Sequence, residues 1–395
     1  MNLYGFILGT NHSLCKVEIC TVLKTKNIDF EIVGASEEIL IIKTKKELDL
    51  NINDFGSTAK LVKFYNKLED IVAEQAINIK SVTFGISVVN GGGKFKQLNE
   101  LYYSSNAIGR EVMTNFREYG IKSGFLPIKE RALSTVSVNE NLLKEEGFEL
   151  ILVSTIDKVL YGKTLSVQDY EGYSKRDFGR PERDDKSGMV PPKIAKMMVN
   201  LAIKEKGDKL LDPFCGSGTF LQEEILLGYE NVEGSDLDIK AVERTKKNLS
   251  WIFPDKNISV SSVDVLKLSA RFKEIDAIIT EPFLGSERLR IMSRDQVFRE
   301  RQKLEIFYTE FFAEFKKVLK ETGRIVIIFP VIRYKNEFLY LDIINSIQKM
   351  GFKLQNYCDF DNELGLNLTN RRTIVYFRPG QTVSREILIF EHAKP

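Results

Sequence analysis

The chain has 395 residues, with 57 lysines and arginines against 55 aspartates and glutamates, so its formal net charge is only +2. This length predicts two or three domains, each with its own core. The total charge gives no indication of nucleic-acid binding, which would have to come from local clusters of basic residues. Two histidines, and four cysteines at positions 15, 20, 215 and 358, form no metal-ligand spacing, so neither a metal site nor a cysteine or serine hydrolase is expected.

Residues 1–70 are predicted to form a small ferredoxin-like domain. Residues 3–8, 28–33 and 38–43 alternate or run apolar as strands do, and residues 13–26 have helical period. This β-α-β-β order indicates an α+β unit.

A second domain that alternates helices and strands is predicted over residues 71–165. Its expected elements are strands at 83–89, 134–138 and 148–153, a helix at 98–118 and a helix that starts at Asn139. Residues 166–190 are predicted to be a linker, and residues 191–395 a final domain.

The final domain opens on a strand, a glycine loop and a helix. Leu210-Leu211 are apolar, and Asp212-Pro213-Phe214-Cys215-Gly216-Ser217-Gly218-Thr219 leads into a helical pattern at 219–227. Gly216 and Gly218 let the backbone approach a ligand, as in nucleotide-type sites at the carboxyl edge of a parallel sheet. The G-x-G-x-x-G repeat of a dinucleotide site and the Gly-Lys-Ser/Thr ending of a phosphate loop are both missing. The run instead resembles the first motif of S-adenosylmethionine-dependent methyltransferases that act on exocyclic amines of bases.

Two further carboxylates follow at spacings that suit such a cofactor. Asp236 ends a short strand about twenty residues after the glycines, where it could accept both hydroxyls of a ribose. Residues 258–265 have the pattern of a strand and its exit, and Asp264 lies at that exit, where it could hold an adenine amine. With Asp212, Pro213, Phe214, Gly216, Gly218 and Thr219, these residues are the predicted cofactor site, and a solvated loop carboxylate is the alternative for each acid.

A proline corner follows the fourth strand, which is predicted at 275–280. The corner reads Glu281-Pro282-Phe283-Leu284, and in amine methylases, which it resembles, the sequence is Asp/Asn/Ser-Pro-Pro-Tyr/Phe. An acceptor side chain and a backbone carbonyl there can hold both N–H groups of a base amine and stabilise charge that develops on nitrogen. Glu281, Pro282 and Phe283 are therefore the predicted catalytic residues. Because glutamate is one methylene longer than aspartate, its acceptor oxygens move by about 1 Å, which can cost a hundredfold in rate.

The last third continues the alternation of helices and strands. A helix is predicted at 307–319, a strand at 323–330, a helix at 337–350 and a closing strand at 372–378. Alternating elements of these lengths predict an α/β fold with a doubly wound sheet. No apolar run approaches a secretory signal or a membrane span, so a cytoplasmic protein without membrane contact is expected.

A long pattern joins the middle domain to the final one. Tyr173-Ser174-Lys175-Arg176-Asp177 is followed by Met189-Val190-Pro191-Pro192-Lys193 and then by Ile194-Ala195-Lys196-Met197-Met198-Val199-Asn200-Leu201-Ala202. This resembles the junction of the tRNA guanosine N2-methyltransferases that act at position ten, a UPF0020-like group in which an RNA-capturing THUMP domain joins the methylase. The N-terminal strand and helix are similar to that family as well.

The resemblance implies a THUMP-like RNA-binding domain over 71–165 and a class I, Rossmann-like methyltransferase domain over 191–395. It implies S-adenosylmethionine as cofactor and tRNA as partner, with the enzyme working either as a monomer or with a small activating protein subunit. Local charge adds candidate RNA contacts, for which a solvated face is the alternative. They are Lys175, Arg176 and Arg180 in the linker and Arg288 and Arg290 after the proline corner.

Two other functions stay open at this point. A DNA amine methyltransferase would share the glycine loop and the proline corner. A degenerate homologue that binds RNA without transferring a methyl group is suggested by the unusual Glu-Pro-Phe-Leu corner. The sequence also leaves open the target nucleotide and the number of methyl groups added.

Overall fold

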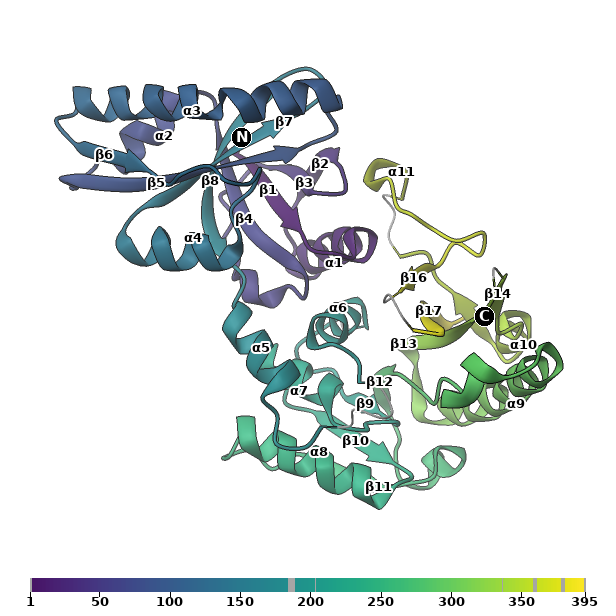
Figure 1. The fold of residues 1–395 in the computed structure, drawn as a ribbon. Coiled ribbons are helices and arrows are strands. Elements are labelled where there is room, and N and C mark those ends of the chain that lie inside the picture. The colour runs from purple at the N-terminus through teal and green to yellow at the C-terminus, as the bar shows by residue number, and fades with distance from the viewer. Residues whose placement is uncertain are drawn as a thin grey trace. The chain divides into compact units, whose positions relative to one another are not determined.

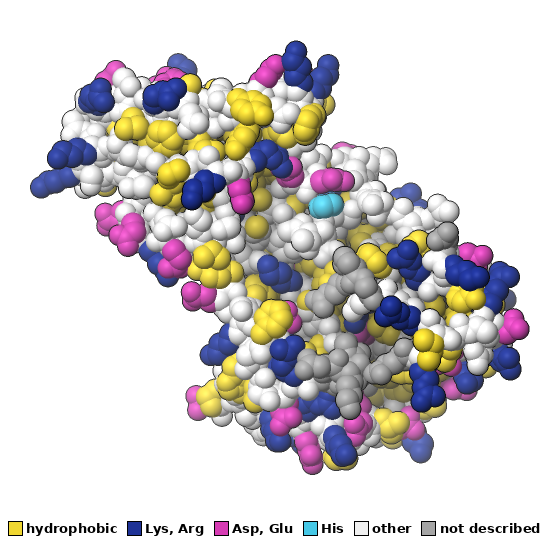
Figure 2. All heavy atoms as spheres, viewed as in Figure 1, with side chains coloured by type: hydrophobic (Ala, Val, Ile, Leu, Met, Phe, Trp, Pro, Cys, Tyr) yellow, Lys and Arg dark blue, Asp and Glu magenta, His cyan; other side chains and the backbone are white. Residues whose placement is uncertain are grey.

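The computed structural model describes residues 2–183, 189–202, 204–335, 337–357, 361–377 and 381–393 (Figure 1). The chain forms two compact units, residues 1–172 with 360–366, and residues 173–359 with 367–395. Within the described residues, no helix is long and apolar enough to cross a membrane. In the view of Figure 2, lysine and arginine side chains are scattered among acidic ones over both units, in keeping with the small net charge.

The first unit begins with a helix and four strands. These are β1 (Asn2–Leu8), α1 (His12–Thr25), β2 (Phe30–Ala35), β3 (Ile39–Thr44) and, after a 3-10 turn at Ile52–Asp54, β4 (Thr58–Tyr65). Apolar side chains of β1 and β3, such as Phe6 and Ile41, are buried, so the predicted β-α-β-β order is confirmed over this segment.

The same unit continues through residue 172. Its further elements are α2 (Leu68–Gln75), β5 (Ser81–Asn90), α3 (Phe95–Glu118), β6 (Lys122–Phe125), α4 (Thr135–Asn141), β7 (Phe148–Ser154), β8 (Val159–Val167) and α5 (Tyr170–Phe178), the last of which runs into the second unit. Phe84, Phe116 and Phe148 pack together in the core between α3 and the sheet.

One sheet runs through the whole unit, in the order β2-β3-β1-β4-β8-β7-β5-β6. Strand β4 lies before the predicted domain boundary at residue 70, and its partner β8 lies after it. The N-terminal strands and the following segment therefore share one continuous sheet. The predicted strand at 134–138 is wrong. The Ser134 side chain accepts a hydrogen bond from the Ser137 backbone N–H and caps α4, so this segment starts a helix instead.

The second unit holds the remaining strands and helices. They are α6 (Pro192–Ala202), β9 (Leu210–Asp212), α7 (Thr219–Leu226), β10 (Val232–Asp236), α8 (Ile239–Ile252), β11 (Ser259–Ser262), β12 (Ile275–Thr280), α9 (Arg294–Val318), β13 (Leu319–Tyr334), β14 (Glu337–Tyr340), α10 (Ile344–Lys349), β15 (Phe352–Leu354), β16 (Ile374–Tyr376) and β17 (Val383–His392). Short 3-10 turns η3 (Val265–Ala270) and η4 (Glu287–Ile291) precede β12 and α9, and α11 (Asp361–Leu364) belongs to the first unit.

The second sheet has the order β11-β10-β9-β12-β13-β17-β15, with β14 and β16 paired at its side. The strands from β11 to β13 are parallel, and β17 runs antiparallel between β13 and β15. A mostly parallel sheet whose strands are joined by helices is a doubly wound arrangement, so the predicted Rossmann-like fold is confirmed.

Several elements of the last third differ from expectation. The helix predicted at 307–319 begins at Arg294, because Ser293 and Gln296 form a reciprocal capping box. The segment 337–350 contains strand β14 before the short helix α10, and the closing strand is β17 rather than 372–378, of which 374–376 form β16 and 378 lies outside the described residues.

Candidate active site

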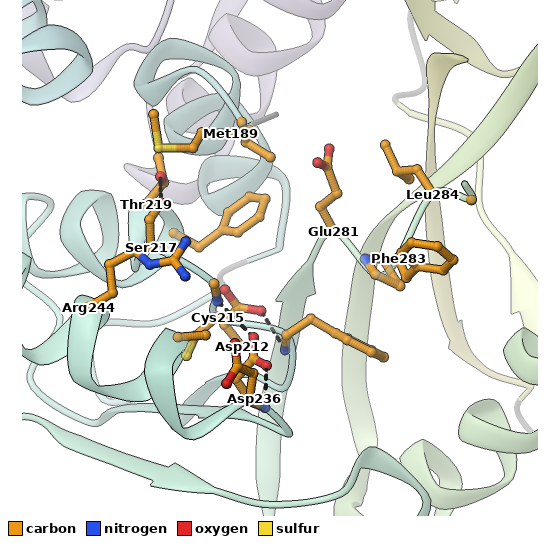
Figure 3. A pocket seen from close by; sticks show the side chains of 18 residues that line it. Met189, Asp212, Cys215, Ser217, Thr219, Asp236, Arg244, Glu281, Phe283 and Leu284 are labelled. Atoms are coloured by element: carbon orange, nitrogen blue, oxygen red, sulfur yellow. Dashed lines mark hydrogen bonds between the residues drawn. The ribbon is translucent and has the colours of Figure 1, made fainter. Parts of the chain in front are cut away.

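A cavity of about 400 Å³ lies at the carboxyl ends of β9, β10 and β12. Two groups of residues face each other across it (Figure 3). The glycine-loop wall is made by Asp212, Phe214, Cys215, Gly216, Ser217, Thr219 and Asp236, and the corner wall by Glu281, Pro282, Phe283, Leu284 and Gly285. The volume is in the range of small-molecule and cofactor sites.

Asp212 ends β9 and is almost fully buried. Its Oδ1 accepts hydrogen bonds from the Phe214 backbone N–H at 3.1 Å and from the Thr280 hydroxyl at 2.7 Å. Its Oδ2 is buried and has no hydrogen-bond partner among the described residues. Burial raises the pKa of this carboxyl to about 7. A ligand that donates a hydrogen bond would satisfy the unpartnered Oδ2.

The glycine loop is fixed by backbone geometry and by Asp236. Gly216 and Gly218 have φ values of 53° and 81°, and a Cβ on Gly218 would lie 2.9 Å from Thr245 Cγ2. Asp236 accepts hydrogen bonds from the backbone N–H groups of Gly216 and Asp238, both at 3.0 Å, and burial raises the pKa of its carboxyl. A carboxylate has about four acceptor positions, so Asp236 keeps capacity for a ligand at the cavity wall.

The structure brings most of the predicted cofactor residues to this cavity. Asp212, Phe214, Gly216, Thr219 and Asp236 line it. Pro213 and Gly218 are buried in the loop and shape it. Asp264 does not line the cavity: its carboxylate accepts from the Leu266 N–H at 3.0 Å and caps η3. The structure therefore does not support the predicted role of Asp264 in holding a ligand.

Other lining residues escaped the sequence analysis. They are Met189, Val190, Cys215, Ser217, Phe220, Asp238, Ala241, Arg244, Leu284 and Gly285. Asp238, Ala241 and Arg244 follow one another at three-residue spacing on α8 and its cap, a signal that could have been read as one helix face turned to the site.

The corner wall carries the three predicted catalytic residues. Glu281 and Phe283 line the cavity, and the Phe283 side chain is 57% exposed. The buried Tyr308 hydroxyl donates to the Phe283 carbonyl oxygen at 3.1 Å and holds the corner against α9. The Glu281 carboxylate is paired with Arg385 of β17, a partner that sequence reasoning did not find.

Two of the predicted RNA contacts are buried instead. The Arg176 Nε donates to Glu223 Oε1 at 2.7 Å, and its guanidinium lies 4.5 Å from the centre of the Tyr173 ring. The Arg180 Nη1 donates to two hydroxyls of the glycine loop, Ser217 at 3.1 Å and Thr219 at 2.9 Å. Because both guanidinium groups are used inside the unit, they are not presented to RNA phosphates, and this part of the prediction is wrong.

The other three predicted RNA contacts are exposed. Lys175 lies over the Trp251 ring at 5.2 Å, and Arg288 and Arg290 belong to η4, directly after the corner wall. In the described part of the chain, no group of three or more His, Cys, Asp and Glu side chains could hold a metal ion. Cys15, Cys20 and Cys215 are buried free thiols, and Cys358 lies outside the described residues.

Comparison with known families agrees with this geometry. Residues 180–351 match the UPF0020 family, described as an RMKL-like methyltransferase domain. The match confirms the resemblance that the glycine loop and the residue 173–202 pattern suggested for this domain.

Three curated relatives are similar to parts of the chain. A tRNA (guanine(10)-N2)-dimethyltransferase of Methanothermobacter thermautotrophicus is 31% identical over 214 residues, covering 51% of this chain and 57% of the relative. The protein of the same description from Methanocaldococcus jannaschii is 39% identical over 148 residues, covering 34% and 40%. The tRNA (guanine(10)-N(2))-methyltransferase TRMT11 of Dictyostelium discoideum is 29% identical over 291 residues, covering 69% and 54%. The matches thus span about half the length of these relatives.

Solved structures share the fold of the whole chain. TrmN from Thermus thermophilus aligns with a TM-score of 0.55 at 15% identity and covers 99% of this chain and 100% of its own. A predicted N6-adenine-specific DNA methylase from Listeria monocytogenes aligns with a TM-score of 0.50 at 13% identity, covering 100% and 96%. At such low identity these likenesses show the fold alone.

Proposed function

We propose that the chain is an S-adenosylmethionine-dependent methyltransferase that acts on the exocyclic N2 of a guanosine in tRNA. The observation that carries the proposal is the cavity in which Asp212 and Asp236 face Glu281 and Phe283 (Figure 3). The curated relatives named above, described as acting on guanine 10 of tRNA, support the choice of substrate.

The glycine-loop wall fits S-adenosylmethionine. The unpartnered Oδ2 of Asp212 can accept a hydrogen bond, the positive φ of Gly216 leaves the backbone open to a ligand, and Asp236 can accept ribose hydroxyls. When bound, the cofactor supplies a sulfonium methyl group, so that an N–C bond forms as the S–C bond breaks.

The corner wall would hold the amine that receives the methyl group. The lone pair of a base amine is delocalised into its ring, which makes the nitrogen a poor nucleophile. Glu281 and the Pro282 carbonyl would accept its two hydrogens, favour a tetrahedral nitrogen and stabilise the positive charge that develops there. The surplus proton on nitrogen then leaves through the Glu281 carboxylate to water. The exposed ring of Phe283 would stack on the extruded base.

The first unit would contribute tRNA binding as the THUMP-like part of the chain, through shape and phosphate contacts. We propose a cytoplasmic enzyme, and an assay with the purified chain alone decides between a monomer and a complex with a small activating subunit.

The test uses the full chain, labelled S-adenosylmethionine and a pool of unmodified tRNA, followed by digestion to nucleosides and mass spectrometry. Label in N2-methylguanosine or its dimethyl form is the expected result. Label in another nucleoside would overturn the assignment of the base. Absence of label, with cofactor binding shown in the same sample, would favour an RNA-binding homologue that has lost the reaction.

A further inference from the structure

The Glu281 carboxylate is held by an arginine that lies 104 positions later in the chain. Arg385 Nε donates to Oε2 at 2.5 Å and Nη2 donates to Oε1 at 3.1 Å, so both carboxylate oxygens are engaged by one planar guanidinium. The side chains are 4% and 12% exposed, Arg385 first, so water screens the pair little. Such a two-point pair fixes orientation as well as charge.

Arg385 is itself fixed by the sheet. It lies on β17 between Pro330 of β13 and Tyr376 of β16 in the strand register. Its Nη1 donates to Gln381 Oε1 at 3.2 Å. The strand continues into the fully buried Ile387 and Leu388, so the guanidinium is anchored to the core rather than to a loop.

Only one member of this pair reaches the cavity. Glu281 lines it, on the wall opposite Ser217 and Thr219 in Figure 3, whereas Arg385 does not line it. The carboxylate that Arg385 binds therefore belongs to a residue of the cavity wall, while Arg385 itself lies outside the lining.

The other charged and titratable groups around Glu281 come from three neighbouring elements. Asp212 of β9 is a like charge, and Tyr308 of α9 is a buried phenol; Tyr376 of β16 interacts with Arg385. Among these groups, Arg385 is the one that donates hydrogen bonds to both oxygens of the Glu281 carboxylate.

We propose that Arg385 is a positioning residue for methyl transfer: it keeps the Glu281 carboxylate ionised and fixed at the cavity wall, where it accepts the amine hydrogens of the base. The inference rests on the proposed function. It also accounts for the glutamate in a slot that holds Asp, Asn or Ser in the motif it resembles. The two hydrogen bonds from Arg385 restrict the additional rotation that the longer glutamate side chain has relative to aspartate.

The test is a double-substitution cycle on the full chain, with initial rates on unmodified tRNA. Arg385→Gln is expected to lower kcat by about 30-fold or more, while KM for tRNA and cofactor affinity change less than about threefold. In the Glu281→Gln background, Arg385→Gln is expected to change kcat by less than about threefold, because the residue acts through Glu281. Arg385→Lys keeps the positive charge but lacks the planar guanidinium, so its kcat is expected to lie between those of wild type and Arg385→Gln. The Lys variant also replaces Arg385→Gln in the test if the latter folds poorly.

A matched control is available in the same strand pair. Arg324 of β13 donates to Glu391 of β17 at 2.8 Å, at the end of β13 away from the cavity. Arg324→Gln breaks a comparable pair and is expected to leave kcat within about twofold of wild type, even where the melting temperature falls.

The outcomes separate this inference from the proposed function. If wild type makes N2-methylguanosine and Arg385→Gln keeps full kcat, the role of Arg385 is overturned and the proposed function stands. Additive losses from the Glu281 and Arg385 substitutions overturn it as well, because they show that Arg385 does not act through Glu281. Wild type that makes no N2-methylguanosine overturns the proposed function and this role with it.

Discussion

The two walls of the cavity hold their carboxylates in different ways. On the glycine-loop wall, Asp212 accepts hydrogen bonds from the Phe214 backbone N–H and the Thr280 hydroxyl, and Asp236 accepts from the backbone N–H groups of Gly216 and Asp238. These donors are all uncharged. On the corner wall, both carboxylate oxygens of Glu281 are bound by one edge of a buried guanidinium.

This difference assigns different tasks to the walls. Burial raises the pKa values of Asp212 and Asp236. The unpartnered Oδ2 of Asp212 leaves an acceptor that a ligand with a hydrogen-bond donor would satisfy. A carboxylate bound at both oxygens by one guanidinium is held in a fixed orientation, as the proposed stabilisation of charge on a methylated amine requires. The first wall is thus suited to binding and the second to the reaction.

The largest effect is expected on the corner wall. Glu281→Gln keeps the shape of the side chain but removes its charge, so kcat should fall by about a hundredfold or more. Cofactor affinity, measured by calorimetry, should stay within about twofold, because the binding wall is untouched. A collapse of cofactor affinity in this variant would break the division between the walls.

A smaller effect is expected from the loop that shapes the first wall. Gly218→Ala places a Cβ 2.9 Å from Thr245 Cγ2 at a φ of 81°, so the loop must shift and cofactor affinity should fall by about tenfold. Gly207→Ala is the matched control in the same unit, since its Cβ would meet nothing within 4 Å. Equal cofactor dissociation constants for both variants would contradict the role of the loop.

The pH dependence of stability should report on Asp212. Its pKa is about 7 in the folded chain, against roughly 3.9 when unfolded, so the folded state binds more protons between these values. The free energy of unfolding therefore falls as pH rises from 4 to 7 through this group. Asp212→Asn should remove this slope. The difference in free energy of unfolding between variant and wild type should therefore shift in favour of the variant by roughly 1–4 kcal/mol from pH 4 to pH 8.

The chain offers a local probe for that measurement. Its single tryptophan, Trp251, lies on α8 in the second unit, so urea unfolding followed by tryptophan fluorescence reports on the unit that contains Asp212. Parallel pH profiles for wild type and Asp212→Asn would contradict the raised pKa.

The smallest effect is expected from the exposed arginines beside the corner wall. Substituting Arg288 or Arg290 by Gln should weaken tRNA binding about two- to fivefold and lower the salt slope by about one for each phosphate that the arginine neutralises. Filter binding over a salt series measures both quantities. An unchanged salt slope would place the RNA elsewhere on the unit.

The two walls also differ in how far the sequence predicts them. Most of the predicted residues of the glycine-loop wall lie in one run of the chain, and contacts such as Asp212 with Phe214 are local, so spacing alone brought them together. Its contact between Asp236 and Gly216 spans 20 positions. The clamp on the corner wall depends on strand pairing with β17, in which Ser384, Arg385 and Glu386 are buried and interrupt the apolar pattern of a strand. These polar residues are buried because their hydrogen-bond partners lie outside β17, as Thr373 does when it donates to Glu386.

The misplaced elements have a similar cause. The helix α4 was expected as a strand because its valines and threonine favour extended backbone, and the Ser134 cap decided otherwise. Arg176 and Arg180 are predicted at the surface because runs of charged residues usually face solvent. Instead, Glu223 binds Arg176, and the Thr219 hydroxyl of the glycine loop binds Arg180. In each case a specific partner outweighed the local tendency.

The central claim is that the corner wall presents a base amine to the methyl donor. The most direct measurement compares two tRNA transcripts that differ only at position ten, one with guanosine and one with inosine, which is the same base without the 2-amino group. Methyl transfer to the guanosine transcript with none to the inosine transcript is the predicted result. Equal transfer to both would contradict the account, because the methyl group would then be going to an atom other than guanine N2.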